Sequence, residues 1–195
     1  MGKGQLTRDA VLNQAARTAS EVGLGGVTIG SLADSMHMSK SGLFAHFGSK
    51  ENLQLATVRH SRDRFVDLVI RPTLAAPRGE PRVRALFENW LEWDTSALPG
   101  GCLFVAAAAE FDDRPGAVRD ELVRNQVDLA ETIARIFRGG IAEGHFRPDA
   151  DPEQFAFDLQ CILLGFHQHS RLLGDPLAVQ RASRALDALL LAVRP

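Results

Sequence analysis

The sequence predicts an all-α fold, with a three-helix N-terminal head followed by a six-helix body, and three observations support this prediction. Apolar residues recur every three or four positions along nearly the whole chain, the spacing that gives a helix one buried face. Capping residues and glycines stand where these patterns begin and end. No stretch shows the strict alternation of apolar and polar residues that is typical of a half-buried strand.

The head is predicted to contain one longer helix and two short ones. The first spans residues 7–23, with Thr7 as its N-cap. Thr28 then caps a short second helix, and a turn follows at residues 37–39. The third helix spans residues 40–47. This order of two short helices joined by a tight turn is typical of a helix-turn-helix unit.

The body is predicted to contain six further helices. Ser49 begins a long helix that Pro72 is expected to end. Near the C-terminus, Asp151 and Asp175 each precede a proline, which predicts an N-cap followed by proline at the first helical position. We therefore expect a DNA-binding domain over residues 1–50 and a helical body over residues 51–195.

Composition limits the class of protein. Of the 195 residues, 45% are apolar, enough for a sizeable core. No run approaches the ~20 apolar residues of a membrane span, and the first residues lack the apolar region of a signal peptide. The two cysteines, Cys102 and Cys161, have no metal-ligand spacing. We expect a reduced, cytoplasmic protein that has no membrane partner, no metal and no cofactor.

Charge is distributed unevenly. The formal net charge is −2, but residues 1–60 hold six Lys or Arg against four acidic residues, a net charge of +2. The remaining residues carry −4. A basic head on an acidic body fits DNA contact through the head.

The residues of the head meet the physical demands of a DNA reader. A small internal core is expected from apolar residues of the second and third helices. Ser39, Lys40, Ser41 and Gly42 at the start of the third helix are small or polar enough to approach base edges and phosphates. The expected core residues are Ile29, Leu32, Ala33, Leu43 and Phe47.

The head resembles the TetR/AcrR family of transcriptional regulators in residue type and spacing. The segment TIGSLAD at residues 28–34 and the segment MSKSGLFAHFGSKENL at residues 38–53 are similar to the family signature, and the resemblance covers residues 5–60. It implies a homodimer that binds double-stranded operator DNA. The residues expected to contact DNA are Thr28, Ser39, Lys40, Ser41, Gly42, Leu43, Phe44, His46 and Lys50.

Several of these positions have a second interpretation. His46 is either a DNA contact or a structural cap, and Gly42 serves either close approach to DNA or helix packing. Phe44 stands where the family usually has tyrosine, so a phosphate hydrogen bond from that hydroxyl is missing. This departure either lowers the affinity for DNA or shifts the contact to His46.

The resemblance also predicts how the body dimerises. In the family, the last two helices pair with their copies in a four-helix interface, which suits two heads reading a palindrome with half-sites about 34 Å, or a multiple of that, apart. The alternative is that both helical faces belong to the internal core. The expected interface residues are Phe155, Leu159, Ile162, Phe166, Leu186, Leu189 and Leu190.

Aromatic residues in the body suggest a cavity for a small apolar effector. Plain core packing is the alternative for each of them, and His167 is either a polar group of the cavity or a satisfied core histidine. An effector that favours one body conformation would release the heads from the operator. The expected ligand contacts are Phe65, Phe87, Trp90, Trp93, Cys102, Phe104 and His167.

Other classes of function have weaker support. An enzyme is disfavoured because the chain has no phosphate loop, nucleophile elbow or zinc motif, and His167 and His169 project ~200° apart on a helix. A DNA-bound activator without ligand control stays open. A thiol sensor through Cys102 has no neighbouring basic residue to lower the pKa of the thiol.

Overall fold

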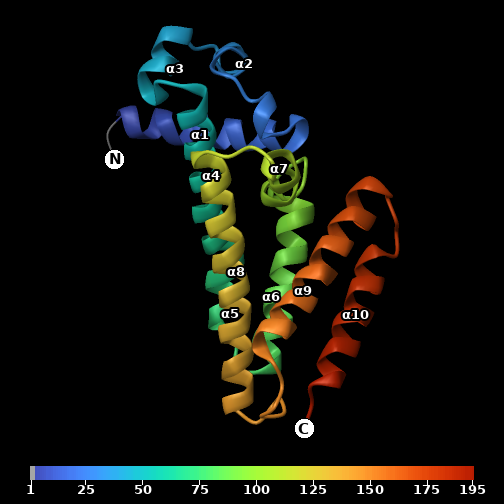
Figure 1. Cartoon of the computed structure of the whole chain (residues 1–195). Coiled ribbons are helices and arrows are strands. Elements are labelled where there is room, and N and C mark those ends of the chain that lie inside the picture. The colour runs from blue at the N-terminus through green and yellow to red at the C-terminus, as the bar shows by residue number, and fades with distance from the viewer. Residues whose placement is uncertain (1–2) are drawn as a thin grey trace. The chain divides into compact units, whose positions relative to one another are not determined.

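The protein is all-helical in a computed structural model that describes residues 3–195, with side chains from Arg8 onward (Figure 1). No strand occurs within these residues, which confirms the predicted fold class. None of the helices in this range combines the length and apolar character that a membrane span needs. The helices are α1 Lys3–Val22, α2 Ile29–Ser35, α3 Lys40–Phe47, α4 Lys50–Phe65, α5 Arg71–Ala75, α6 Glu80–Glu92, α7 Leu103–Phe111, α8 Ala117–Ala142, α9 Pro152–His167 and α10 Ala178–Ala192.

Two predicted helix starts are wrong. Helix α1 begins at Lys3, so Thr7 lies inside the helix and is not its N-cap. Helix α10 begins at Ala178 rather than at Pro176. Asp175 is the reason, because its carboxylate accepts the Leu177 N–H at 2.9 Å and forms a local turn ahead of the helix.

Pro72 does not end the fourth helix. Proline cannot donate the hydrogen bond that an α-helix requires of it, and the preceding residues adapt by forming a π turn over Val66–Ile70. The Arg71 N–H bonds to the Val66 carbonyl across this wider turn, and α5 continues to Ala75. The prediction of an end near Arg71 is therefore wrong, because a π turn accommodates the proline.

The chain forms two compact units, which divide it differently from the predicted boundary at residue 50. The first unit contains the residues up to Arg64 together with Ser96–Arg124. Polar contacts explain why the second segment belongs to it. The Gly25 N–H donates to Glu110 of α7 at 2.7 Å, and the Gly100 N–H donates to the Ser20 hydroxyl at 3.0 Å.

The second unit contains Phe65–Thr95 and Asn125–Pro195. Helices α9 and α10 pack against each other in it, with Asp151 capping α9 as predicted by accepting two backbone N–H groups (Figure 1). Three stacked phenylalanines fill one part of its core: the Phe137 ring lies 4.5 Å from Phe146 and 4.2 Å from Phe155 between centroids.

Candidate nucleic-acid interface

The helix-turn-helix has a small core of its own. Leu32 and Ala33 of α2 and Leu43 and Phe47 of α3 are buried, as predicted, and Ile29 is half-buried. Leu43 has no exposed surface. The prediction that Leu43 contacts DNA is therefore wrong, because packing against α2 directs its side chain into the core.

The turn between α2 and α3 is tight. The Met38 N–H donates to the Ala33 carbonyl at 2.9 Å and closes the end of α2. His37 has a φ of 53°, a left-handed conformation that histidine adopts more readily than most residues with side chains. This turn brings α3 across α2 in the arrangement that a helix-turn-helix requires (Figure 1).

Both short helices begin with a side-chain cap. The Thr28 hydroxyl accepts the Ser31 N–H at 3.0 Å, and the Ser31 hydroxyl in turn accepts the Thr28 N–H at 3.3 Å. Ser39 caps α3 by accepting the Gly42 N–H at 3.1 Å. The Thr28 cap follows the prediction, whereas Ser31 was missed, because a capping box usually has glutamate or glutamine three positions after the cap and here a serine takes that role.

Gly42 has a packing role. A Cβ atom at this position would lie 2.9 Å from the Ser39 hydroxyl oxygen, so a side chain would disturb the cap of α3. This favours the packing interpretation of Gly42 over close approach to DNA. The residue stays half-buried beside an exposed face of α3 formed by Lys40, Ser41, Phe44 and Ala45.

The two predicted lysine contacts have different surroundings. The end of the Lys40 chain lies over Gly30, because a Cβ atom added there would be 3.8 Å from Lys40 Cε. Lys50 donates from its ammonium group to the Gly25 carbonyl in the loop before α2. Both side chains are exposed, and their contacts with phosphate remain predictions.

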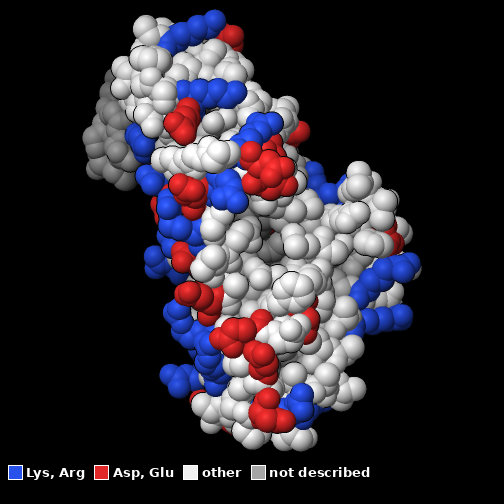
Figure 2. All heavy atoms as spheres, in the orientation of Figure 1, with Lys and Arg blue, Asp and Glu red and all other residues white. Residues whose placement is uncertain are grey.

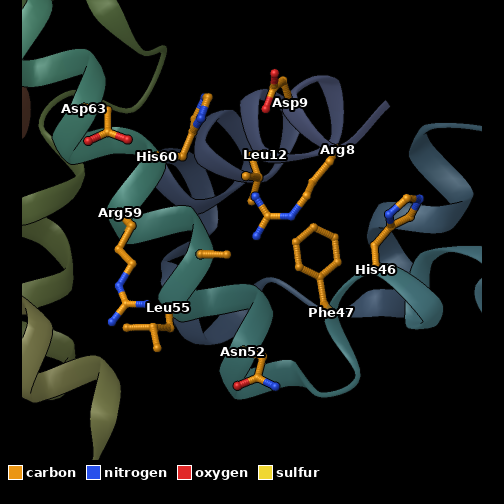
Figure 3. Close-up of a pocket in the computed structure, with 11 residues that line it drawn as sticks. Arg8, Asp9, Leu12, His46, Phe47, Asn52, Leu55, Arg59, His60 and Asp63 are labelled. Atoms are coloured by element: carbon orange, nitrogen blue, oxygen red, sulfur yellow. The ribbon is translucent and has the colours of Figure 1, made fainter. Parts of the chain in front are cut away.

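His46 turns toward a groove with a volume of about 480 Å³, formed by α1, α3 and α4 (Figure 3). The Arg8 guanidinium lies over the Phe47 ring at 5.4 Å from its centroid. His60 and Asn13 hydrogen bond at 3.0 Å, and burial together with the nearby Arg64 charge lowers the pKa of His60. Polar and cation–π contacts along this groove therefore connect α1 to α3 and α4.

Family models match both parts of the chain. A model described as "Tetracyclin repressor-like, C-terminal domain" matches residues 79–186, and one described as "Bacterial regulatory proteins, tetR family" matches residues 11–57. The chain belongs to the TetR family. It is a DNA-binding transcriptional regulator, and the sequence resemblance is confirmed.

Individual relatives agree with this assignment along most of their length. The transcriptional repressor AcnR of Corynebacterium glutamicum is 26% identical over 82% of this chain and 79% of its own. A TetR regulator of Chloroflexus aurantiacus has a TM-score of 0.87 at 26% identity, covering 98% of this chain and 96% of that one. A CifR cysteine mutant complexed with 26-base-pair operator DNA has a TM-score of 0.78 at 26% identity, covering 93% and 96%.

The predicted ligand residues of this TetR-family protein fall in both compact units. Five belong to the second unit, where the Phe65 and Trp93 rings meet edge to face at 5.4 Å and Trp90 lies 6.4 Å from Phe166 between centroids. Cys102 and Phe104 are buried in the first unit. The 3% exposure of Cys102 also disfavours the thiol-sensor alternative, since an oxidant needs access to the sulfur.

Asp94 is a site residue that the sequence prediction missed. It has no exposed surface, and its carboxylate lies 2.6 Å from His167 Nδ1. A signal was present, because Asp94 stands four residues after Trp90 and so continues the buried face of α6. The TetR-family body therefore holds a buried carboxylate paired with a half-buried histidine, and these residues directly follow Trp93 and Phe166 in the sequence.

Most of the predicted dimer contacts are wrong. Five of the seven residues are buried within a single chain, because α9 and α10 pack against each other and α9 also packs against α6 and α8 inside the second unit. Phe155 stacks on Phe137, and Phe166 meets Trp90. Ile162 and Leu189 are half-buried and stay predictions. The five buried residues are Phe155, Leu159, Phe166, Leu186 and Leu190.

A different face of the same two helices is exposed and apolar. On α9 it contains Phe157 and Leu164, which are 62% and 50% exposed, with the exposed Cys161 between them. On α10 it contains Leu191, which is 67% exposed. We call these four residues the α9–α10 outer face. Figure 2 shows a continuous uncharged area over these helices, with basic side chains at its edge.

Proposed function

We propose that the chain is a repressor that binds a palindromic operator as a homodimer and is released by a small apolar ligand. The observation that carries the proposal is the capped helix-turn-helix, whose α3 exposes small and apolar residues on the face opposite its core. The match of family models to both head and body supports it.

Dimerisation is supported by the α9–α10 outer face. Phe157, Leu164 and Leu191 each expose at least half of their surface to water on two helices that pack against each other, and exposed apolar surface of this kind favours an interaction site. A second copy of this chain fits, because two heads held at a fixed spacing bind both half-sites of a palindrome. One short recognition helix makes few base contacts by itself.

Ligand control is supported by the surroundings of Trp90 and Trp93. Aromatic rings provide apolar contact area, and the Asp94–His167 pair supplies a polar group that fixes orientation. A ligand that binds the two body conformations unequally would shift the operator affinity, typically by ~1–3 kcal/mol.

The first experiment measures DNA binding by the full chain. Operators are selected from a random DNA pool, and binding is followed by fluorescence anisotropy over a salt series. We expect two chains per palindrome and an affinity that falls with salt, since phosphate contacts release counterions. Equal affinity for selected and random DNA would overturn the proposal.

Ligand release has its own readout. Trp90 and Trp93 are the two tryptophans of the chain, and both lie in the aromatic part of the second unit. A ligand in this region changes tryptophan fluorescence, and at saturation it weakens operator binding by about tenfold. Ligands that change the fluorescence but leave the operator affinity unchanged would contradict ligand control.

A further inference from the structure

The exposed face of α3 has few groups that can hydrogen bond to bases. It consists of Lys40, Ser41, Phe44 and Ala45, since Leu43 and Phe47 point into the core. Base readout by hydrogen bonds usually relies on arginine or lysine at guanine and on asparagine or glutamine at adenine. Among arginine, lysine, asparagine and glutamine, this face of α3 contains one residue, Lys40.

The polar groups of this face are directed elsewhere. Ser41 donates its hydroxyl hydrogen to the Ser39 hydroxyl at 3.4 Å, and Ser39 itself caps α3. The end of the Lys40 chain lies against α2, because a Cβ atom at Gly30 would be 3.8 Å from Lys40 Cε and 3.9 Å from Nζ. Phe44 and Ala45 are therefore the groups that α3 presents outward.

Phe44 has the properties of an apolar contact residue. Its side chain is 54% exposed, and its small neighbours Ser41 and Ala45 on the same face leave the ring accessible. The phenylalanine ring has no hydroxyl with which to bond a phosphate. Removing the apolar surface of this ring from water is favourable, so contact with an apolar partner would stabilise a complex.

We infer that Phe44 reads the 5-methyl group of a thymine in the operator half-site. The major groove presents one apolar group, the thymine methyl, and phenylalanine and alanine are side chains that contact it. The inference rests on the proposed operator binding by α3 and specifies what α3 recognises. It makes Phe44 a determinant of sequence specificity rather than a non-specific DNA contact.

The test removes single methyl groups from the DNA. In the selected operator, each thymine is replaced in turn by deoxyuridine, which lacks the methyl group and keeps the base pairing. With the parent protein, we expect the dissociation constant to rise about threefold to fivefold for at least one thymine per half-site. With Phe44→Ala, the thymine and deoxyuridine operators should bind equally.

Two further variants separate the alternatives. Phe44→Tyr keeps the ring and should keep the sensitivity to the methyl group, whereas Ala45→Gly tests the neighbouring apolar residue. Three outcomes would overturn the assignment to Phe44. The Phe44→Ala protein could still distinguish thymine from deoxyuridine, or this discrimination could be lost only in Ala45→Gly. The parent protein could also bind the thymine and deoxyuridine operators equally. If the parent selects no operator from the pool, the proposed function itself fails, which is a different result from methyl-independent operator binding.

Discussion

Leu43 and Phe44 are neighbours in α3 with opposite environments. Leu43 has no exposed surface, whereas Phe44 exposes 54% of its own. In a helix of eight residues, apolar residues at positions 43, 44 and 47 are compatible with two orientations of the buried face. The sequence therefore predicts the helix and its core, and tertiary packing decides which apolar side chain stays exposed on the surface of α3.

This difference predicts unequal effects of truncation on stability. We expect Leu43→Ala to lower the free energy of unfolding by ~2–5 kcal/mol, since it leaves a cavity in the head. Phe44→Ala should change it by less than ~1 kcal/mol, because the ring is largely in water. Urea unfolding followed by circular dichroism measures both. Equal losses of unfolding free energy in the two variants would contradict the prediction that Leu43 is buried and Phe44 is exposed.

Asp94 shows what kind of residue a sequence pattern overlooks. Periodicity is usually traced through apolar residues, so an acidic residue on the buried face looks like the end of the pattern. Asp94 is buried with its carboxylate against His167, which lies 73 positions further along the chain. The sequence contains both residues, but their pairing depends on the packing of distant helices.

At the scale of elements, most helices follow from periodicity and caps, and the exceptions follow from local chemistry. Helix α3 has the predicted bounds, and Asp151 caps α9 as expected. The π turn before Pro72 departs from the prediction. A proline signals a break in hydrogen bonding, but whether the helix ends or widens for one turn depends on the packing of the residues that follow.

Glu121 of α8 connects α8 to α4 within the first unit. From its ion pairs we predict that the stability of the protein depends on pH. Its carboxylate accepts hydrogen bonds from Arg59 of α4 at 2.9 Å and from Arg124 at 2.8 Å. Burial raises the pKa of Glu121, but the bonds from Arg124 and Arg59 outweigh it and lower the pKa below its ordinary value of 4.5. The stabilisation is therefore present above pH 4.5 and is lost as the pH falls through the lowered pKa.

The variant Glu121→Gln removes this contribution. We expect it to be less stable than the parent protein at pH 7, by about 1 kcal/mol because both arginines are more than half exposed. The difference should shrink toward zero as the pH falls below 4.5 and through the lowered pKa of Glu121, and urea unfolding at several pH values measures it. Glu131→Gln, at an exposed position of the same helix, is the matched control. A difference that is constant with pH would contradict the role of the charge.

At the scale of the whole molecule, the sequence predicts the family and the order of functions along the chain, but not which faces meet. Helices α9 and α10 each carry apolar residues on more than one side. A pattern of apolar residues does not say which side packs inside the chain. Phe155 and Leu159 pack inside, whereas Phe157 and Leu164 are exposed. The proposed dimer contact therefore lies on the α9–α10 outer face, on a different side of these helices from the residues that the sequence analysis expected.

A charge on this face distinguishes an interface from ordinary surface. In a two-fold dimer, Phe157→Glu places one carboxylate from each copy in the same apolar contact, where an unpaired buried charge costs several kcal/mol. We expect its dimer dissociation constant to rise at least about 100-fold in analytical ultracentrifugation, with a parallel loss of operator affinity. Leu74→Glu is the matched control, because Leu74 is 49% exposed on α5 and lies outside this face. A Phe157→Glu protein that stays dimeric at the concentration of the parent would show that the two copies meet elsewhere, while loss of the dimer in both variants would point to a general effect of added charge.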